Sequence, residues 1–254
     1  MKISKIQIKN FRLLKDFSLD LEDELSLIIG KNNTGKTSVL TALDKFLNQS
    51  GRKVITLDDF NVELKKELLQ YLSGSKKFPD GNGYQPLGIE LKVYIEYTEQ
   101  DDLSQVRSLI MSLDPNDNNI VLKFEYNIDY EQLLKVKGDY IEQSKRFDDN
   151  PELFLKEHLS DYFGSVEKRS LLFTDEAVFI DLIKENIQLN DILSFDFISA
   201  KRSVTNKDND KTLSRQTAKI YKRSDESNEQ IDASDKFKET LRKTDDELST
   251  IYAD

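Results

Sequence analysis

The eight residues from Gly30 to Thr37, GKNNTGKT, constrain this chain more than any other stretch, because they match the phosphate-loop pattern G-x-x-x-x-G-K-[S/T]. An apolar run at 25–29 precedes them, and apolar residues at helical spacing follow. A strand, a glycine-bounded loop and a helix, in this order, form a phosphate site. We therefore predict a buried strand over 25–29 and a helix that begins at Thr37 and ends at 48–51.

Each residue type of the motif has a physical role at such a site. Gly30 and Gly35 allow the backbone to curl so that successive N–H groups point inward. Lys36 supplies a mobile positive charge for the β- and γ-phosphates, and the Thr37 hydroxyl is the expected Mg²⁺ ligand. The motif predicts a nucleoside triphosphate with Mg²⁺. The alternative is a glycine-rich loop with a solvated lysine.

Composition excludes several other kinds of site. The 254 residues include no Cys and one His, which excludes disulfides and the usual zinc sites and leaves oxygen ligands for any metal. The formal net charge of -10 argues against attraction of nucleic acid to the whole surface, although a local basic patch is compatible with it. Because we find neither a membrane-length apolar run nor a signal-peptide core, we expect a cytoplasmic protein.

Apolar periodicity predicts the remaining secondary structure. Alternation of period two predicts antiparallel strands near residues 3–8, 17–21, 89–97 and 120–128, and an apolar run predicts a last strand at 192–199. Helical spacing predicts a helix capped by Asp58 or Asp59 and running to Leu72, a helix over 103–113, and a helix opened by Asn150-Pro151.

Composition changes after Ala200, which suggests a domain over 1–200 and a charged helical segment over 201–254. The part 201–223 holds eight Lys/Arg and two Asp, whereas 225–247 holds nine Asp/Glu and four Lys/Arg. The basic run either contacts DNA or a partner subunit, or forms a solvated helix that pairs with the acidic run. The apolar residues of the segment lie near a helical stripe, so we expect a helix that needs a partner.

The first 50 residues resemble the start of the SMC, RecF and OLD group of ABC-type ATPases. The resemblance rests on a first strand, the turn Asn10-Phe11-Arg12, a second strand and then the phosphate loop. In addition, the stretch Ile198–Arg202 resembles the strand and Ala-x-Arg element of the OLD (overcoming lysogenization defect) nucleases. Leu213–Gln216 and Lys219–Tyr221 fit the helical stretch that follows this element.

This resemblance implies an α/β P-loop NTPase fold: the N-terminal lobe of an ABC-type ATPase head, with a mixed or antiparallel sheet and a helical C-terminal segment. Such heads dimerise around ATP, and in OLD proteins a Toprim nuclease domain follows. We find no signature loop, second-lobe Walker B strand or Toprim pattern. The chain is therefore expected to be the N-terminal lobe of a longer protein, and no residue is assigned a catalytic role.

The resemblance also implies individual site residues. Ser38 is expected to donate to the α-phosphate. Arg12 is expected to approach the nucleotide, the alternative being a solvated surface arginine, and Arg202 contacts nucleotide or the partner head, or forms a salt bridge. The residues that map onto the phosphate loop are Gly30, Asn32, Asn33, Thr34, Gly35, Lys36 and Thr37.

Three further features have a functional and a structural interpretation. Leu171–Glu176 looks like an apolar strand that ends in a catalytic Asp-Glu pair, but a hairpin turn is favoured. Leu72–Ser75 looks like a fragment of an ABC signature loop, but a plain turn is favoured. For His158, a packed or surface histidine is favoured over a metal ligand.

The leading functional hypothesis is an ATP-binding head of an OLD-like, DNA-directed ATPase or nuclease in bacterial anti-phage defence or DNA processing, with ATP gating head dimerisation. The alternatives are a RecF-like or SMC-like repair or chromosome ATPase, and a nucleotide-binding regulatory module without turnover. Expected partners are a second copy or higher oligomer, DNA, and a further protein of a defence system, without a membrane. Apolar surface meant for a missing lobe predicts self-association or marginal stability.

Overall fold

The computed structural model describes residues 1–32, 34–48, 54–98, 100–112, 114 and 117–196. Residues Met1–Phe195 form one compact unit, and Asp196–Asp254 form a second. Apart from Asp196, the second unit lies outside the described residues. The predictions for the helical segment 201–254, for Arg202 and for the OLD-like stretches at 198–202, 213–216 and 219–221 also lie outside them.

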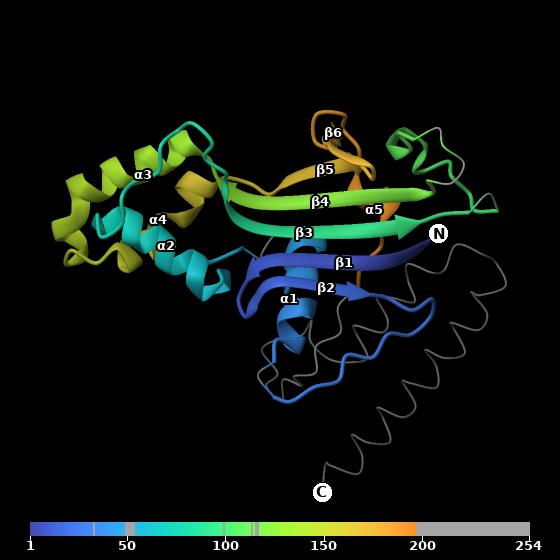
Figure 1. Cartoon of the computed structure of the whole chain (residues 1–254), viewed down its shortest axis with the longest axis horizontal. Helices are drawn as coiled ribbons and strands as arrows, with labels where there is room; N and C mark the ends of the chain where they lie inside the picture. Colours follow the sequence, from blue (N-terminus) through green and yellow to red (C-terminus); the bar gives the residue numbers. More distant parts are fainter. Residues whose placement is uncertain (33, 49–53, 99, 113, 115–116, 197–254) are drawn as a thin grey trace, which may run out of the picture. The chain divides into compact units, whose positions relative to one another are not determined.

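The first unit is built on a six-stranded antiparallel sheet with the strand order β2-β1-β3-β4-β5-β6 (Figure 1). The strands predicted at 3–8, 89–97 and 120–128 are confirmed, and the one predicted at 17–21 overlaps the second strand. The six strands are β1 (Lys2–Phe11), β2 (Leu14–Asp20), β3 (Leu87–Glu96), β4 (Asn119–Ile128), β5 (Glu167–Leu172) and β6 (Asp175–Asp181).

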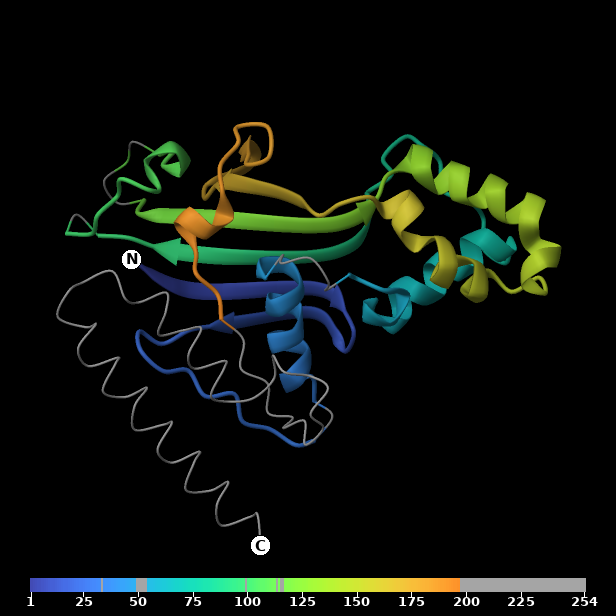
Figure 2. The same ribbon diagram turned by 180° about the vertical axis from the view of Figure 1, so that it is seen from behind.

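One face of this sheet carries the hydrophobic core. Ile8 lies opposite Leu91, which in turn lies opposite Phe124, and all three side chains are fully buried. The helix α1 (Lys36–Leu47) crosses this face and contacts β1 and β3 (Figures 1 and 2). Phe46 of α1 packs on Phe124 with ring centroids 6.4 Å apart. The helix predicted after the phosphate loop is confirmed, and it begins one residue earlier than predicted.

The opposite face of the sheet carries charged side chains in neighbouring strands. The Lys123 ammonium lies 3.2 Å from a carboxylate oxygen of Glu90 and 2.9 Å from one of Glu125. The hairpin of β5 and β6 reaches the same face, where Phe173 packs edge-on against Tyr94. Cross-strand pairs of opposite charge stabilise a sheet face of this kind.

Three helices form a cluster beside one end of the sheet (Figures 1 and 2). They are α2 (Val62–Ser73), α3 (Tyr130–Gln143) and α4 (Pro151–Phe163), and they contact one another. Phe163 of α4 stacks on Tyr126 of β4 and meets Phe60 edge-on, which joins the cluster to the sheet. The predicted start of α4 is confirmed, because the Asn150 side chain accepts from the backbone N–H of Glu152 and Leu153.

Short helical elements complete the unit: the 3-10 turns η1 (Leu57–Asp59), η2 (Arg107–Leu109) and η3 (Ser144–Phe147) and the single-turn helix α5 (Leu189–Ile192). Among the helices of the described ranges, none has the length and apolar character that crossing a bilayer requires.

The strand predicted at 25–29 is wrong. This run has no regular secondary structure, and it lies at the surface with Leu25, Leu27 and Ile29 exposed by 70%, 73% and 89%. A strand requires a hydrogen-bonded neighbour, and the described residues provide none for this run. An apolar run alone therefore gave the wrong prediction.

Two helix predictions need correction. The predicted helix at 103–113 is, within the described residues, only the turn η2, which buries Val106 and Leu109 without a longer helix. Asp58 and Asp59 do not cap α2, because both lie in η1, and the cap is Asn61, which accepts from the Glu63 N–H.

The strand predicted at 192–199 is also wrong for its described part. Ile192 ends α5, and residues 193–196 have no regular secondary structure. Residues 197–199 lie outside the described residues.

Candidate phosphate-binding site

The phosphate loop leads directly into α1 through Gly35, which precedes the first helical residue, Lys36. Gly35 has φ +92°, a left-handed conformation that side-chain-bearing residues rarely adopt. A Cβ at this position would also lie 3.0 Å from Leu14 Cδ2 and 3.8 Å from Leu13 Cβ. The turn between β1 and β2 therefore packs directly against the loop, and both the conformation and the space require glycine.

The side chain of Lys36 folds back over its own loop. Its Nζ donates to the carbonyl oxygen of Gly30 at 2.6 Å and to that of Lys31. The Thr34 hydroxyl donates to the same Lys31 carbonyl at 2.9 Å. The loop thus forms a compact curl with the Lys36 ammonium at its centre, where a mobile cation can reach a bound phosphate.

The beginning of α1 suits an anion. Its first turn contains no acidic residue, and Gly35 provides no side-chain cap, so the partial positive charge of the helix start is not neutralised from within. Thr37 is exposed beside Lys36, which suits a hydroxyl ligand of Mg²⁺. No group of three His, Cys, Asp or Glu side chains in the described ranges could hold a metal ion, so Mg²⁺ would depend on Thr37, phosphate oxygens and water.

The other predicted loop residues differ in exposure. Asn32 and Thr34 are exposed, whereas Asn33 lies outside the described residues. Ser38 is buried in the first turn of α1, with 7% of its surface exposed. Its contact with an α-phosphate stays a prediction.

Arg12 forms an ion pair with Asp59. Its Nε and Nη2 lie 3.0 and 2.8 Å from Oδ1 of Asp59, and its guanidinium lies 5.3 Å from the ring centre of Phe11. The side chain is 37% exposed, so it is neither a free surface arginine nor fully buried. An approach of Arg12 to nucleotide stays a prediction.

Backbone hydrogen bonds fix the turn that carries Arg12. The Arg12 N–H donates to the Asp59 carbonyl at 2.8 Å, and the Asn61 N–H donates to the Asn10 carbonyl at 2.8 Å. The Asn61 side chain donates to the Arg12 carbonyl at 2.7 Å, and Phe11 forms a β-bridge with Phe60. Asn10 and Arg12 both have positive φ, a conformation that persists where the surroundings impose it.

Asp59 is the central acceptor of this region, with 1% of its surface exposed. Its Oδ2 accepts from the Thr56 N–H at 2.9 Å, from the Thr56 hydroxyl at 3.1 Å, and from Nζ of Lys45 in α1. Burial favours the neutral carboxyl, but the hydrogen bonds from Lys45, Thr56 and Arg12 outweigh it and hold the pKa of Asp59 below its ordinary value.

The sequence predicts only a capping role for Asp59. The spacing Thr56-x-x-Asp59 is a capping-box pattern, and the reciprocal Thr56–Asp59 hydrogen bonds are present. This pattern was a local signal for Asp59. Nothing in the sequence signalled its cationic partners, Arg12 of the β1–β2 turn and Lys45 of α1.

Comparison with known proteins identifies the family. A family model described as an AAA ATPase domain matches residues 1–254. The chain belongs to this AAA ATPase family. Membership in this family agrees with the prediction, made from the motif, of a nucleotide-binding ATPase of α/β P-loop type.

Relatives of this AAA ATPase domain are distant. An uncharacterized protein of Methanocaldococcus jannaschii is 25% identical over 202 residues, 76% of this chain and 56% of that protein. The DNA replication and repair protein RecF of Streptococcus thermophilus is 26% identical over 205 residues, 68% of this chain and 54% of that protein. RecF of Bacillus cytotoxicus is 46% identical over 43 residues, 17% of this chain and 12% of that protein. The chain spans about half the length of the first two relatives.

Asp175 and Glu176 belong to a hairpin in this AAA ATPase domain. This confirms the interpretation as a hairpin turn, which was favoured over a catalytic pair. β5 ends at Leu172, residues 173–174 form the turn, and β6 begins at Asp175. Glu176 binds Lys92, and Asp175 accepts from the Ala177 N–H at 3.0 Å. Both carboxylates therefore have structural partners.

The favoured interpretations of the other two features are also confirmed. Leu72 and Ser73 are the last residues of α2, and the chain turns at Gly74, which has φ +74°. His158 packs against Phe147 and Phe154, and its Nδ1 lies 3.0 Å from a carboxylate oxygen of Asp161.

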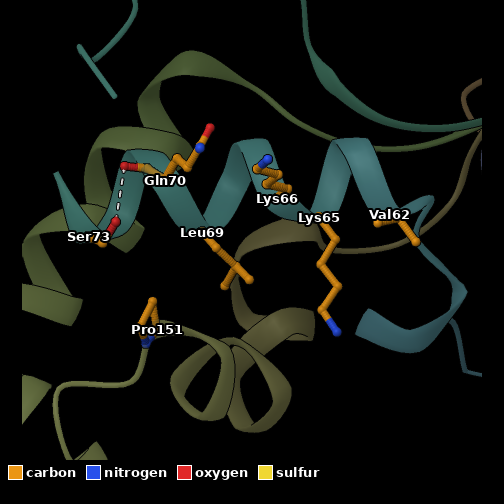
Figure 3. Close-up of a pocket in the computed structure, with 7 residues that line it drawn as sticks. All are labelled: Val62, Lys65, Lys66, Leu69, Gln70, Ser73 and Pro151. Atoms are coloured by element: carbon orange, nitrogen blue, oxygen red, sulfur yellow. Dashed lines mark hydrogen bonds between the residues drawn. The ribbon is translucent and has the colours of Figure 1, made fainter. Parts of the chain in front are cut away.

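A shallow groove of about 420 Å³ lies along α2, remote in sequence from the phosphate loop (Figure 3). The ammonium of Lys65 on its rim is bound to Glu152 at 2.7 Å. Apolar atoms of Val62, Leu69 and Pro151 contribute to its lining, and none of its lining residues belongs to the phosphate loop at 30–37. It is lined by Val62, Lys65, Lys66, Leu69, Gln70, Ser73 and Pro151.

Proposed function

We propose that this AAA ATPase domain binds ATP with Mg²⁺ at residues 30–37 and serves as the head lobe of an OLD-like, DNA-directed ATPase or nuclease. One observation carries the nucleotide assignment. The Lys36 ammonium is centred over a curled loop that ends at the uncapped start of α1. A cation beside the uncapped start of a helix is suited to a polyphosphate.

The loop residues have distinct roles in this proposal. Backbone N–H groups around Gly35 and the start of α1 hold the phosphates, and Lys36 neutralises charge on the β- and γ-phosphates. The Thr37 hydroxyl would hold Mg²⁺, Asn32 and Thr34 belong to the loop, and Ser38 lies in the first turn of α1. Mg²⁺ held there would screen the negative charge of the phosphates.

No described carboxylate is assigned to the hydrolysis of ATP. The one pair that resembled a catalytic Asp-Glu is the hairpin at 175–176, where Glu176 binds Lys92. Turnover in our proposal therefore requires a carboxylate supplied by another part of the complete protein or by a second copy.

The wider part of the proposal concerns assembly. ATP gates the dimerisation of two heads, or a higher oligomer, in a cytoplasmic protein that acts on DNA, with a further protein of an anti-phage defence system as partner. The resemblance of the N-terminal turn, Asn10–Arg12, to the SMC, RecF and OLD group supports a DNA-directed ATPase, and the resemblance of the sequence Ile198–Arg202 to the OLD nucleases supports the OLD-like role. A test is cross-linking of the full-length protein with ATP, with ADP and without nucleotide. Dimerisation that is independent of ATP would contradict the gating.

The similarity to RecF of Streptococcus thermophilus favours a second candidate, a RecF-like repair ATPase without a nuclease. Incubation of the full-length protein with DNA, ATP and Mg²⁺ distinguishes the two. DNA cleavage supports the OLD-like nuclease, whereas ATP-dependent DNA binding without cleavage supports the RecF-like protein. Nucleotide binding without turnover or DNA binding supports a regulatory module.

Calorimetry with Mg-ATP tests the nucleotide site itself. Lys36→Ala should weaken binding at least about tenfold, since a hydrogen bond to a charged group contributes about 1.5–3 kcal/mol. Lys66→Ala is the control, because the Lys66 side chain is exposed on α2, outside the phosphate loop. Equal affinities for wild type and Lys36→Ala would overturn the site.

A further inference from the structure

We propose that Asp59 is a positioning residue for the phosphate site, which it serves by holding α1 through Lys45. The inference rests on the proposed nucleotide binding at residues 30–37. Asp59 itself is buried and lies outside the phosphate loop, so any effect on nucleotide must pass through the groups that it binds.

The helix α1 is attached to the β1–β2 hairpin at both of its ends. At the N-terminal end, Leu14 packs against Gly35, so closely that a Cβ on Gly35 would lie 3.0 Å from Leu14 Cδ2. At the C-terminal end, Lys45 binds Asp59, and Asp59 binds Arg12 of the hairpin turn. The first attachment is apolar contact, and the second is an ion-pair bridge.

These two attachments add to the packing of Phe46 on the sheet in setting the direction of the helix. A helix rises about 1.5 Å per residue, so Lys36 and Lys45 lie about 13 Å apart along the axis of α1. With Leu14 as the contact at one end, a displacement of the Lys45 end tilts the helix about Gly35. Such a tilt redirects the first-turn N–H groups that would face a phosphate.

The charges around Asp59 make the bridge sensitive to its carboxylate. The Lys45 and Asp59 side chains are 15% and 1% exposed, and Arg12 binds the other oxygen of the same carboxylate. A single buried negative charge thus holds two cations close together. Without this charge the two cations repel each other across a poorly solvated region, which drives the last turn of α1 away from the hairpin.

Lys45 has one further partner, which keeps it in place. Its Nζ donates to the Val54 carbonyl at 2.8 Å. Replacing Lys45 removes the bridge but leaves the buried Asp59 carboxylate paired, because Arg12 and Thr56 still donate to it.

The experiment compares Lys45→Met, which keeps length but removes the charge, with Lys45→Arg, which keeps the charge. Mg-ATP affinity is measured by calorimetry, and the amide signals of Gly35 and Lys36 are followed by NMR without nucleotide. Lys45→Met should weaken binding about threefold to tenfold, the equivalent of one hydrogen bond, and shift both amide signals. Lys45→Arg should restore affinity to within about twofold, on the same scale.

Lys15→Met is the matched control. Lys15, like Lys45, pairs with a carboxylate, but the side chains of Lys15 and its partner Glu63 are 64% and 68% exposed. It should leave affinity and the two amide signals unchanged. The direct variant Asp59→Asn is read by NMR as well, provided its spectrum shows the native fold, and should shift the same two amide signals.

The outcomes separate this inference from the proposed function. If wild type does not bind Mg-ATP, or Lys36→Ala binds as well as wild type, the proposed function fails and the positioning role fails with it. If binding depends on Lys36 but folded Lys45→Met has wild-type affinity and unshifted amides, the positioning role alone is overturned. A Lys45→Arg variant as weak as Lys45→Met also overturns it.

Discussion

Lys92 of β3 and Glu176 of β6 form an ion pair in which the Lys92 ammonium lies 2.6 and 2.7 Å from the two carboxylate oxygens of Glu176. The Lys92 side chain is only 6% exposed, whereas that of Glu176 is 56% exposed. The acidic residue at the start of β6 thus compensates a buried cation on the charged face of the sheet. Phe173, in the turn of the β5–β6 hairpin, adds an edge-on contact with Tyr94 of β3.

Glu176→Gln should therefore lower the free energy of unfolding by about 1–2 kcal/mol, because the buried ammonium loses its closer carboxylate, while Glu90 at 3.8 Å and solvent reduce the loss. Glu157→Gln is the control. Glu157 is exposed to nearly the same degree, 55%, but its partner Arg146 is also exposed. Its loss should stay below about 0.5 kcal/mol. Urea unfolding measures both, and equal losses would contradict a role for Lys92 burial.

Gly35→Ala should be more damaging than Gly74→Ala. Both glycines have positive φ, but a Cβ at Gly35 meets Leu14 at 3.0 Å, whereas a Cβ at Gly74 meets nothing within 4 Å. Gly74→Ala should cost about 1 kcal/mol for its conformation alone. Gly35→Ala should cost more and also weaken Mg-ATP binding. Thermal unfolding and calorimetry measure the two effects, and similar stability losses would argue against close packing of the turn on the loop.

Acid should weaken the fold partly through Asp59. Its pKa is lowered in the folded protein, so its stabilisation is complete above the pKa of the unfolded chain, about 3.9, and is lost as the pH falls through the lower folded value. In urea unfolding between pH 7 and pH 2, Asp59→Asn should therefore lose stability less steeply than wild type below about pH 4.

Asp58→Asn is the control for this pH series, because the neighbouring Asp58 side chain is 73% exposed. It should keep the wild-type slope. At neutral pH, Asp59→Asn should already be less stable by about 3 kcal/mol, since it leaves buried cations with a weaker partner. A parallel pH dependence of Asp59→Asn and wild type would show that Asp59 does not titrate with unfolding.

The exposed run at 25–29 should promote self-association of the isolated domain. Leu27→Ser should weaken it about tenfold, because burial of a leucine side chain contributes about 1.5–3 kcal/mol. Ile141→Ser is the control, since Ile141 is exposed by 62% on α3, away from this run in the chain. Sedimentation velocity at rising concentration measures the effect. A wild-type domain that stays monomeric at high concentration would contradict the prediction.

Apolar periodicity predicted strands correctly where both strands of a neighbouring pair lie among the described residues. The alternating residues at 89–97 and 120–128 pair with each other as β3 and β4, so the apolar side chains of both meet on one face. The start of α4 was predicted because Asn150 and Pro151 act locally. These features depend on a few consecutive residues or on one consistent pattern.

Periodicity failed where the outcome depended on distant partners. Val106 and Leu109 are spaced three apart, which the short turn η2 satisfies as well as a long helix. Phe60 was predicted to lie in a helix, but its β-bridge with Phe11 holds it extended, and α2 begins after Asn61. The phosphate motif located the loop, but the bridge from Arg12 through Asp59 to Lys45 joins three segments and has no single-segment pattern.

The place of β1 within the sheet has a consequence for synthesis of the chain on the ribosome. β1 pairs with β2, which follows at once, and with β3, which begins only at Leu87. At about 5–20 residues per second, β3 emerges several seconds after the first hairpin, with the phosphate loop and α1 already made. During that interval the nascent hairpin has an open edge that a chaperone can cover. The nucleotide site of a new molecule therefore matures only after β3 has paired.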